Sequence, residues 1–301
     1  MRTWLRPRRS RSGSGFKGRD DRMREFPFFK MSGSGNDFIF VDHRDVDWES
    51  WDLPEMARLL CRRRISVGAD GLVLIVPPKD PSNDFAWRFF NADGSEAEMC
   101  GNAARCAARF AALKGLACSA TMRFETISGV IEAELVGDGA RVRMGDPSQI
   151  RPQVRVPLPQ GAIELLFMDS GVPHAVHFVG NLEGVDVVGL GRLIRHHEAF
   201  SPRGTNVDFV EVLDPSTIKM RTYERGVEDE TLACGTGAVA CALAAHLRGE
   251  VQPPVSVITR SGGRLAVDFR ADGMGGYTGV YLQGDARLIY QGLIKPDALA
   301  Q

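Results

Sequence analysis

The 301-residue sequence lacks any apolar run of the roughly 18 residues that a membrane-spanning helix requires. It also lacks a Cys-x-x-Cys pair, and its six cysteines are few for its length. So few cysteines, with no such pair among them, argue against both a disulfide framework and a zinc site. This cysteine usage fits the reducing cytoplasm. The absence of a Gly-Lys-Ser or Gly-Lys-Thr sequence argues against nucleotide hydrolysis.

Charge is small in total but unevenly distributed along the chain. The net charge is −1, and residues 1–25 contribute +6 from nine Lys or Arg and three Asp or Glu, which leaves −7 for residues 26–301. Binding to nucleic-acid phosphates depends on Lys and Arg, so an acidic body argues against a nucleic-acid partner. The hydrophobic content of 44% is ordinary for a globular protein.

The first 22 residues are rich in Arg, Ser and Gly and contain no apolar core of the ~7–15 residues that a signal peptide needs. An organellar transit segment and a nucleic-acid-binding arm are alternatives. The composition fits best a disordered extension, or residues that precede a true start at Met23. The pattern Gly13-x-Gly15-x-x-Gly18 has no strand before it and no helix after it. We therefore interpret it as a chance match to the dinucleotide-binding fingerprint.

Short alternating or apolar runs dominate the rest of the chain and predict many strands, several of them closed by turn pairs such as Asp138-Gly139. The predicted strands are 37–41, 71–76, 84–90, 121–126, 129–136, 139–144, 162–168, 174–179, 207–213, 217–223, 255–260, 263–269 and 277–290. The predicted helices are 54–63, 101–114, 186–197 and 235–247. This spacing is typical of antiparallel sheet structure with a few helices.

Two of the predicted helices belong to an internal repeat. Residues 99–115 read MCGNAARCAARFAALKG, and residues 233–249 read ACGTGAVACALAAHLRG. Aligned without gaps, both begin with Cys-Gly, continue with Ala-rich sequence and end with Gly. Gly115 and Gly249 suit the left-handed position that follows a helix. Because both segments are small and apolar nearly all round, we expect each helix to be buried in its own domain.

The repeat predicts an α+β fold of two pseudo-symmetric domains, each a curved, mostly antiparallel sheet around a central helix. A second repeated motif supports this fold, because similar sequences, GNDF at 35–38 and GTNVDF at 204–209, begin two predicted strands. We place the boundary near residue 144, where a Gly-Asp-Pro turn opens a Pro-rich stretch. The expected units are a disordered basic extension 1–25, a first domain 26–144 completed by the C-terminal strand 288–301, and a second domain 145–287.

Cys100 and Cys234 each stand at the start of a helix. The positive end of the helix dipole and the free N–H groups there favour a thiolate, so we expect a thiol pKa lowered from ~8.5 toward neutrality. The same N–H groups can bind a carboxylate. They belong to Gly101 and Asn102 in one helix and to Gly235 and Thr236 in the other. Two such helix starts facing each other offer an acid or base on each side of one carbon, which is what inversion of an α-carbon requires.

The remaining cysteines have a plainer interpretation. A buried cysteine is usually a small apolar side chain, and we expect this of Cys61, Cys106, Cys118 and Cys241. Two Cys-Gly helix starts within an internal repeat are much harder to explain by packing. We therefore assign a catalytic role to that pair alone.

Five motifs of the chain resemble the successive motifs of diaminopimelate epimerases. They are GSGNDF (33–38), FNADGSEAEMCGN (90–102), SGVPH (170–174), RGTNVDF (203–209) and YERGVEDETLACGTGA (223–238). They occur in the family's order and cover the chain from about residue 28 to its end. The resemblance implies two pseudo-symmetric domains with the active site in the cleft between them. It also implies cofactor-independent, metal-free epimerisation of LL-2,6-diaminopimelate to meso-diaminopimelate, in lysine and cell-wall precursor biosynthesis.

The resemblance also implies roles for individual residues. Cys100 and Cys234 are the expected acid/base pair, with His174 assisting Cys100 and Glu224 assisting Cys234. Substrate binding is implied for the four N–H positions named above and for Asn36, Asn91, Asn206, Glu224 and Arg225. The planar guanidinium of Arg225 suits a bidentate hold on the distal carboxylate. Taken alone, an Asn before a strand is usually a turn or cap residue, an Arg is a solvated charge and a His is structural.

Two positions depart from the best-known members of the family. Gly71 stands where many members have Gln, and Val172 stands where many have Asn before Pro-His. Each change removes a side-chain hydrogen bond to the substrate. The bonds are lost unless backbone groups or water replace them, and we expect the reaction to be unchanged.

Three rival functions remain. In a two-cysteine racemase of the proline racemase type, Gly-His follows the first cysteine, whereas Gly101-Asn102 follows it here, and Arg225 would have no distal carboxylate to bind. A thiol redox or metal-binding protein would need closely spaced cysteines. A nucleic-acid-binding module would rest only on the N-terminal arm. The partner that we expect is the small-molecule substrate, with no membrane partner and a homodimer as the one candidate assembly.

Overall fold

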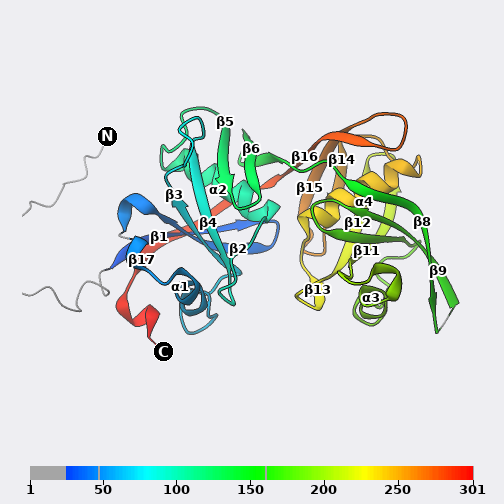
Figure 1. The fold of residues 1–301 in the computed structure, drawn as a ribbon, viewed down its shortest axis with the longest axis horizontal. Coiled ribbons are helices and arrows are strands. Elements are labelled where there is room, and N and C mark those ends of the chain that lie inside the picture. Colours follow the sequence, from blue (N-terminus) through cyan, green and yellow to red (C-terminus); the bar gives the residue numbers. More distant parts are fainter. Residues whose placement is uncertain (1–24, 47, 160, 301) are drawn as a thin grey trace, which may run out of the picture.

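The computed structural model describes residues 25–46, 48–159 and 161–300, so the predicted extension at 1–25 lies almost entirely outside the described residues. The described chain forms two lobes side by side, and the C-terminal strand returns to the N-terminal lobe (Figure 1). None of the helices in the described ranges is long and apolar enough to cross a membrane.

In the described part of the chain, the N-terminal lobe holds eight strands, two α-helices and three short 3-10 helices. Its strands are β1 (Phe26–Gly33), β2 (Asn36–Asp42), β3 (Gly71–Val76), β4 (Phe85–Asn91), β5 (Thr121–Thr126), β6 (Gly129–Val136), β7 (Gly139–Arg143) and β17 (Arg287–Ile294). Its helices are α1 (Leu53–Leu60), α2 (Gly101–Leu113), η2 (His43–Asp45), η3 (Trp48–Ser50) and η5 (Pro296–Leu299).

The C-terminal lobe holds the other nine strands of the described chain. They are β8 (Ser148–Leu158), β9 (Gly161–Asp169), β10 (Pro173–Phe178), β11 (Asn206–Asp214), β12 (Thr217–Glu224), β13 (Asp229–Thr231), β14 (Val255–Ile258), β15 (Arg264–Ala271) and β16 (Tyr277–Asp285). Its helices are α3 (Val187–Arg195), α4 (Gly235–Leu247) and η4 (Glu198–Phe200).

The two lobes repeat one sheet topology, as the sequence repeat predicts. Strands β1 to β7 pair in chain order, antiparallel except for the parallel pairs β2–β3 and β4–β5. The strands β9, β10, β11, β12, β14, β15 and β16 pair in the same succession, with β10–β11 and β12–β14 parallel. The edge strand is β17 beside β1 in one lobe and β8 beside β9 in the other. Pairing of β7 with β16 then joins the two halves into one continuous sheet.

Each lobe buries its sheet between two helices. The inner helices α2 and α4 lie in one core that the lobes share, in which Phe110 and Leu243 are fully buried. The outer helix α1 covers the other face of the first sheet, and α3 covers the other face of the second. The predicted architecture of a curved sheet around a central helix is therefore confirmed.

The helix ends follow from local sequence. Asp52 and Asp186 cap α1 and α3 by accepting a hydrogen bond from the backbone N–H three residues on. Gly115 and Gly249 follow α2 and α4 with φ of 63° and 75°, the left-handed conformation that glycine adopts without strain. Both glycines stand where the repeat predicts a helix end.

All four predicted helices are present, and the predicted strands match with three additions and one division. The additions are β1, β8 and β13, and the predicted strand 277–290 is divided into β16 and β17 at Ala286. The Pro-rich stretch that follows the predicted boundary near residue 144 forms most of β8. Because β9 is the only described strand that pairs with β8, Pro152 and Pro157 of β8 remove no hydrogen bond that a second described neighbour needs.

Candidate active site

The N-termini of α2 and α4 meet where the two lobes join. A Cβ built on Gly235 would lie 3.9 Å from the Cα of Gly101, so the two helix starts are in direct contact. Leu282 of β16 packs under both, with its Cδ2 only 3.1 Å and 3.0 Å from the Cβ positions of Gly101 and Gly235. A side chain at either position would press on Leu282. This close approach explains why Gly follows Cys in both repeats.

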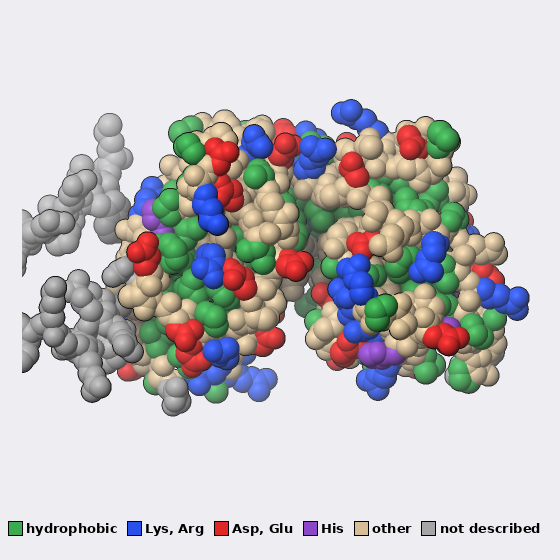
Figure 2. Space-filling view, viewed as in Figure 1, with side chains coloured by type: hydrophobic (Ala, Val, Ile, Leu, Met, Phe, Trp, Pro, Cys, Tyr) green, Lys and Arg blue, Asp and Glu red, His purple; other side chains and the backbone are tan. Residues whose placement is uncertain are grey.

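Cys100 and Cys234 are the N-cap residues of these helices. Both have extended backbone conformations, with φ and ψ of −145° and 115° at Cys100 and of −123° and 116° at Cys234. The Cys234 thiol accepts a hydrogen bond from the N–H of Gly237 at 3.4 Å. The molecular surface is hollowed between the two lobes on the face that Figure 2 shows. The predicted pair therefore stands at the junction of the lobes, as the repeat requires.

The predicted lowering of the thiol pKa values is wrong for this structure. Burial raises the pKa of Cys100 and raises that of Cys234 well above its ordinary value. The helix N–H groups do lower both pKa values, but burial outweighs them. Burial therefore favours the neutral form of both thiols, and a thiolate at either position needs a nearby group that takes up its proton.

His174 lies on the Cys234 side of the site. Its Nδ1 is 2.7 Å from Asp208 Oδ2, and its Nε2 is 2.9 Å from the hydroxyl of Thr236. That hydroxyl is 3.5 Å from the Cys234 sulfur. The resemblance implies that His174 assists Cys100, whereas its contacts here lead to Cys234.

Glu224 is electrostatically coupled to both thiols. Burial raises the pKa of its carboxyl group, and its charge contributes to the raised pKa values of Cys100 and Cys234. Glu224 is the last residue of β12, three residues after Arg221, which forms a salt bridge with Glu230. The negative charge of Glu224 therefore raises the pKa of both thiols, whereas the resemblance implies a role for Glu224 at Cys234.

Asn36 and Asn102 form one side of the site together with Arg105, a residue that the sequence analysis missed. Arg105 is fully buried and donates to the Asn102 side-chain oxygen at 2.8 Å. The Asn102 amide nitrogen then donates to Asn36 Oδ1 at 2.6 Å, and Asn36 donates to Asp70 at 3.0 Å. These hydrogen bonds fix the orientations of the Asn102 and Asn36 side-chain amides. The available sequence signal was a pair of arginines, Arg105 and Arg109, within an otherwise small and mostly apolar helix.

Arg105 also connects the site to the strand that links the lobes. Its guanidinium donates to the Ser34 hydroxyl at 2.7 Å and to the backbone carbonyls of Gly101 and Asp285. Burial lowers its pKa, because a desolvated charge is disfavoured. All its described hydrogen-bond acceptors are neutral groups, so this cation is buried without a carboxylate in contact.

The side-chain amides of Asn91 and Asn206 form hydrogen bonds to other groups of the protein. Asn91 is exposed and donates to the Ser95 hydroxyl at 3.0 Å, in the turn after β4. Asn206 is buried, donates to the carbonyl of Pro173 at 2.9 Å and accepts from the N–H of Arg225 at 2.8 Å. Asn206 therefore positions the backbone that carries Arg225.

Arg225 has a half-buried guanidinium that donates to the carbonyl of Arg203 at 3.3 Å. Burial lowers its pKa, and the charges of Arg203 and Arg195 lower it further. No carboxylate in the described ranges forms a salt bridge with it. An incoming anion would relieve the repulsion among these cations, which is the property of a carboxylate site.

The two departures from the family pattern have different surroundings. A Cβ on Gly71 would lie 2.5 Å from the ring of Phe89 and 2.7 Å from the carbonyl oxygen of Phe90, so the Phe89 ring fills the space of a side chain there. Val172 is half-buried, and its carbonyl accepts a hydrogen bond from the N–H of Ser170 at 3.2 Å.

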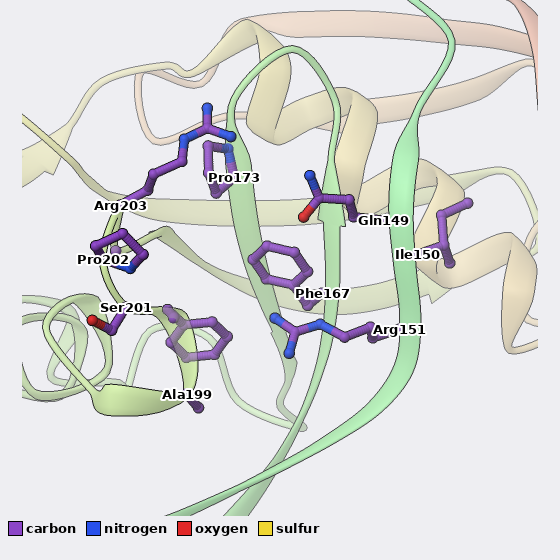
Figure 3. A pocket seen from close by; sticks show the side chains of 11 residues that line it. Gln149, Ile150, Arg151, Phe167, Pro173, Ala199, Ser201, Pro202 and Arg203 are labelled. Carbon is purple, nitrogen blue, oxygen red and sulfur yellow. The ribbon is translucent and has the colours of Figure 1, made fainter.

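A cavity of about 560 Å³ borders the site in the C-terminal lobe. Figure 3 shows Arg151 near Phe167, and Arg203 above Pro173 at the other end of the cavity. The Arg151 guanidinium lies 4.1 Å from the Phe167 ring centroid. Because neither cysteine lines this cavity, we define the site by the thiols. Within the described ranges, no three His, Cys, Asp or Glu residues are grouped as metal ligands.

Comparison with known proteins identifies the family. The sequence profile described as Diaminopimelate epimerase matches residues 28–150 and 166–289, once in each lobe. A diaminopimelate epimerase of Aquifex aeolicus is 46% identical over 280 residues, which is 90% of this chain and 99% of that protein. A second, from Hydrogenobaculum, is 42% identical over 281 residues, 88% of this chain and 97% of that protein.

The chain belongs to the diaminopimelate epimerase family. The family consists of isomerases that epimerise an amino acid.

Solved structures of other enzymes share the fold of this diaminopimelate epimerase family member. A hydroxyproline epimerase from Agrobacterium vitis, with bound trans-4-hydroxy-L-proline, aligns with a TM-score of 0.66 at 16% identity, covering 91% of this chain and 93% of that chain. A PhzF-family phenazine biosynthesis protein from Bacillus anthracis aligns with a TM-score of 0.70 at 14% identity, covering 90% and 99%. At these identities the likeness shows the fold alone.

Proposed function

We propose that this protein converts LL-2,6-diaminopimelate to meso-diaminopimelate, without a cofactor, by a two-base mechanism that uses Cys100 and Cys234. The observation that carries the proposal is the meeting of two Cys-Gly helix N-termini over Leu282. One thiolate removes the α-proton from one face of the substrate, and the other thiol returns a proton to the opposite face. The relatives named diaminopimelate epimerase, at 39–46% identity, support this reaction.

The helix N-termini would also bind the carboxylate beside the reacting carbon. The donors are the N–H groups of Gly101 and Asn102 in α2 and of Gly235 and Thr236 in α4. Negative charge builds on that carboxylate as the α-proton leaves, and fixed N–H dipoles stabilise it most at that moment. Closure of the lobes over the substrate would remove water and strengthen these contacts.

The remaining substrate contacts would come from side chains around the thiols. Arg225 would bind the distal carboxylate, since its guanidinium is half-buried among other cations and has no carboxylate partner in the described chain. Asn36, Asn91 and Asn206 would contact polar groups of the substrate in exchange for hydrogen bonds that they make to the protein here. Glu224 would assist both thiols and face the substrate.

A direct assay separates this proposal from its rival. Purified protein without added cofactor should epimerise LL-diaminopimelate and leave L-proline unchanged. The shared fold of the hydroxyproline epimerase keeps the proline racemase type as the alternative, but the distal-carboxylate arginine favours a substrate with two carboxylates. Turnover of L-proline at a comparable rate would contradict the proposal.

We propose that the protein works in the cytoplasm, in lysine and cell-wall precursor biosynthesis. All six cysteines are free, which suits a reducing compartment. We also propose the two domains 26–144, completed by 288–301, and 145–287. The return of β17 to β1 supports this division, because the last strand joins the first lobe.

We propose a homodimer that forms through the edge strand β17. Four large apolar side chains are exposed on this strand: Leu288, Ile289, Tyr290 and Leu293. An exposed apolar edge strand is suited to association with a second copy. Replacing Tyr290 with Asp should convert a dimer to a monomer in sedimentation experiments. A wild-type protein that sediments as a monomer at assay concentrations would contradict the dimer.

A further inference from the structure

We propose that the Thr236 hydroxyl relays a proton between Cys234 and His174, and that Asp208 positions His174 for this exchange. The inference deepens the proposed function and rests on it, because it assumes that Cys234 exchanges a proton with the substrate. Thr236 therefore has two roles, one for its backbone N–H and one for its side chain. Thr236, His174 and Asp208 act through Cys234 and are positioning residues.

The geometry is a series of three contacts. Asp208 Oδ2 lies 2.7 Å from His174 Nδ1, His174 Nε2 lies 2.9 Å from Thr236 Oγ1, and Thr236 Oγ1 lies 3.5 Å from Cys234 Sγ. His174 and Asp208 are both completely buried. Each contact is within hydrogen-bond range for its elements, since bonds to sulfur are longer. The four side chains thus form a continuous path from a carboxylate to the thiol.

The direction of each hydrogen bond follows from Asp208, the carboxylate at one end of the path. An ionised carboxylate only accepts, so the proton of a neutral His174 is on Nδ1 and its Nε2 is an acceptor. The hydroxyl of Thr236 must then donate to Nε2, which leaves its oxygen lone pairs facing the Cys234 thiol. Thr222 fixes the other oxygen of Asp208 by donating to it at 2.7 Å.

The proton transfer balances without another reactant. As the S–H bond of Cys234 breaks, its proton joins the Thr236 oxygen, and the original Thr236 proton moves to His174 Nε2. The products are a thiolate and an imidazolium, with the Thr236 hydroxyl restored and the total charge unchanged. The new hydroxyl proton donates to the thiolate, and the imidazolium lies against the Asp208 carboxylate.

The electrostatic surroundings explain why a relay is needed. Burial raises the pKa of Cys234, and the charges of Glu224 from β12 and Asp208 from β11 raise it further. A thiolate formed there without an internal proton acceptor would be strongly disfavoured. An imidazolium on the same path offsets the negative charge of the thiolate, so the total charge of the buried site does not change.

The relay belongs to one cysteine only. In the repeat, Asn102 occupies the position two residues after Cys100 that Thr236 occupies after Cys234. The Asn102 amide is already engaged by Arg105 and Asn36. The Cys100 thiol therefore serves as an internal control in any measurement of the Cys234 thiol.

The test compares the two thiols in one sample. Thr236→Val keeps the shape and the backbone N–H but removes the hydroxyl. In substrate-free enzyme treated with iodoacetamide, mass spectrometry should show the alkylation rate of Cys234 relative to Cys100 falling roughly tenfold or more, and kcat falling on the order of 100-fold with little change in KM. Thr236→Ser restores the hydroxyl and should restore both values.

The control is Ser170→Ala, which removes the 2.9 Å hydrogen bond to the Thr236 carbonyl and leaves the hydroxyl in place. Its alkylation ratio should match wild type. If Thr236→Val fails to fold, Asp208→Asn should lower the same ratio. An unchanged ratio in a folded Thr236→Val or Asp208→Asn protein, or failure of Thr236→Ser to restore it, would overturn the relay. Because alkylation requires no turnover, it is independent of the epimerase assay that tests the proposed function.

Discussion

At the scale of single residues, Arg225 should decide which substrate the enzyme accepts. Arg225→Met keeps bulk but removes the fork that grips a carboxylate. Losing a half-buried, charge-assisted contact should lower kcat/KM for LL-diaminopimelate by roughly two orders of magnitude. Arg58→Met, at an exposed ion pair with Glu55, is the matched control and should change kcat/KM by no more than about twofold. Near-normal kinetics for Arg225→Met would return this residue to the role of a solvated charge.

Glu224 should make the protein less stable as pH rises. Its folded-state pKa is raised above its ordinary value of 4.5 by burial, so the folded state keeps a proton that the unfolded state loses above that value. Stability from this group is complete below pH 4.5 and is lost as pH rises through the folded pKa. Glu224→Gln does not titrate at this position, so its Tm should exceed that of wild type increasingly as the pH rises above 4.5 and through the folded-state pKa of Glu224, while kcat falls. A pH-independent difference in Tm would contradict this account.

Some residues of the site could be predicted from the sequence, and some contacts between them could not. Cys100 and Cys234 could be predicted because the Cys-Gly repeat is visible in the sequence. The link from His174 to Thr236 could not, because it depends on the parallel register of β10 and β11, which sets His174 opposite Asn206 and places Asp208 on the same face. The extent of burial also depends on tertiary packing, and that burial reverses the expected direction of both thiol pKa shifts.

At the scale of elements, the pairing of β7 with β16 fixes the position of one lobe against the other. A Cβ on Gly139 would lie 2.1 Å from the backbone oxygen of Gly284, so Gly139→Ala must separate the two strands. We expect a loss of roughly 2–3 kcal/mol in the free energy of unfolding and a lower kcat, because the helix N-termini shift. Gly145→Ala, with open space around it, should change stability by less than about 0.5 kcal/mol. Thermal unfolding of both variants distinguishes them, and equal Tm values would refute the close approach.

Element prediction succeeded where periodicity and turn residues agree and failed where edge strands relax the usual rules. The helices α2 and α4 have both a repeated start and a glycine end, and they match the prediction closely. The strand β8 contains two prolines, which argue against a central strand but are tolerated at an edge. Strand β16 pairs with β7, and β17 pairs with β1. The division between β16 and β17 therefore depends on contacts far apart in the sequence.

At the scale of the whole molecule, residues 1–22 should be dispensable. The family match begins at residue 28, and the segment has no apolar periodicity with which to offset the entropy of ordering. A chain that starts at Met23 should equal the full-length protein in Tm and in kcat/KM. A large loss of either quantity would show that these residues contribute to the folded enzyme.

The central claim is that two cysteines on opposite lobes serve opposite faces of one carbon. The most direct test is turnover of LL-diaminopimelate in D₂O by wild type, Cys100→Ala and Cys234→Ala. Wild type should give meso product that carries deuterium at the inverted carbon, while recovered substrate stays largely unlabelled in the initial phase. Each Ala variant should lose inversion, and the surviving thiol should at most exchange the proton on its own face. Substantial epimerisation by either variant, or return of the original proton to the product, would contradict the two-base account.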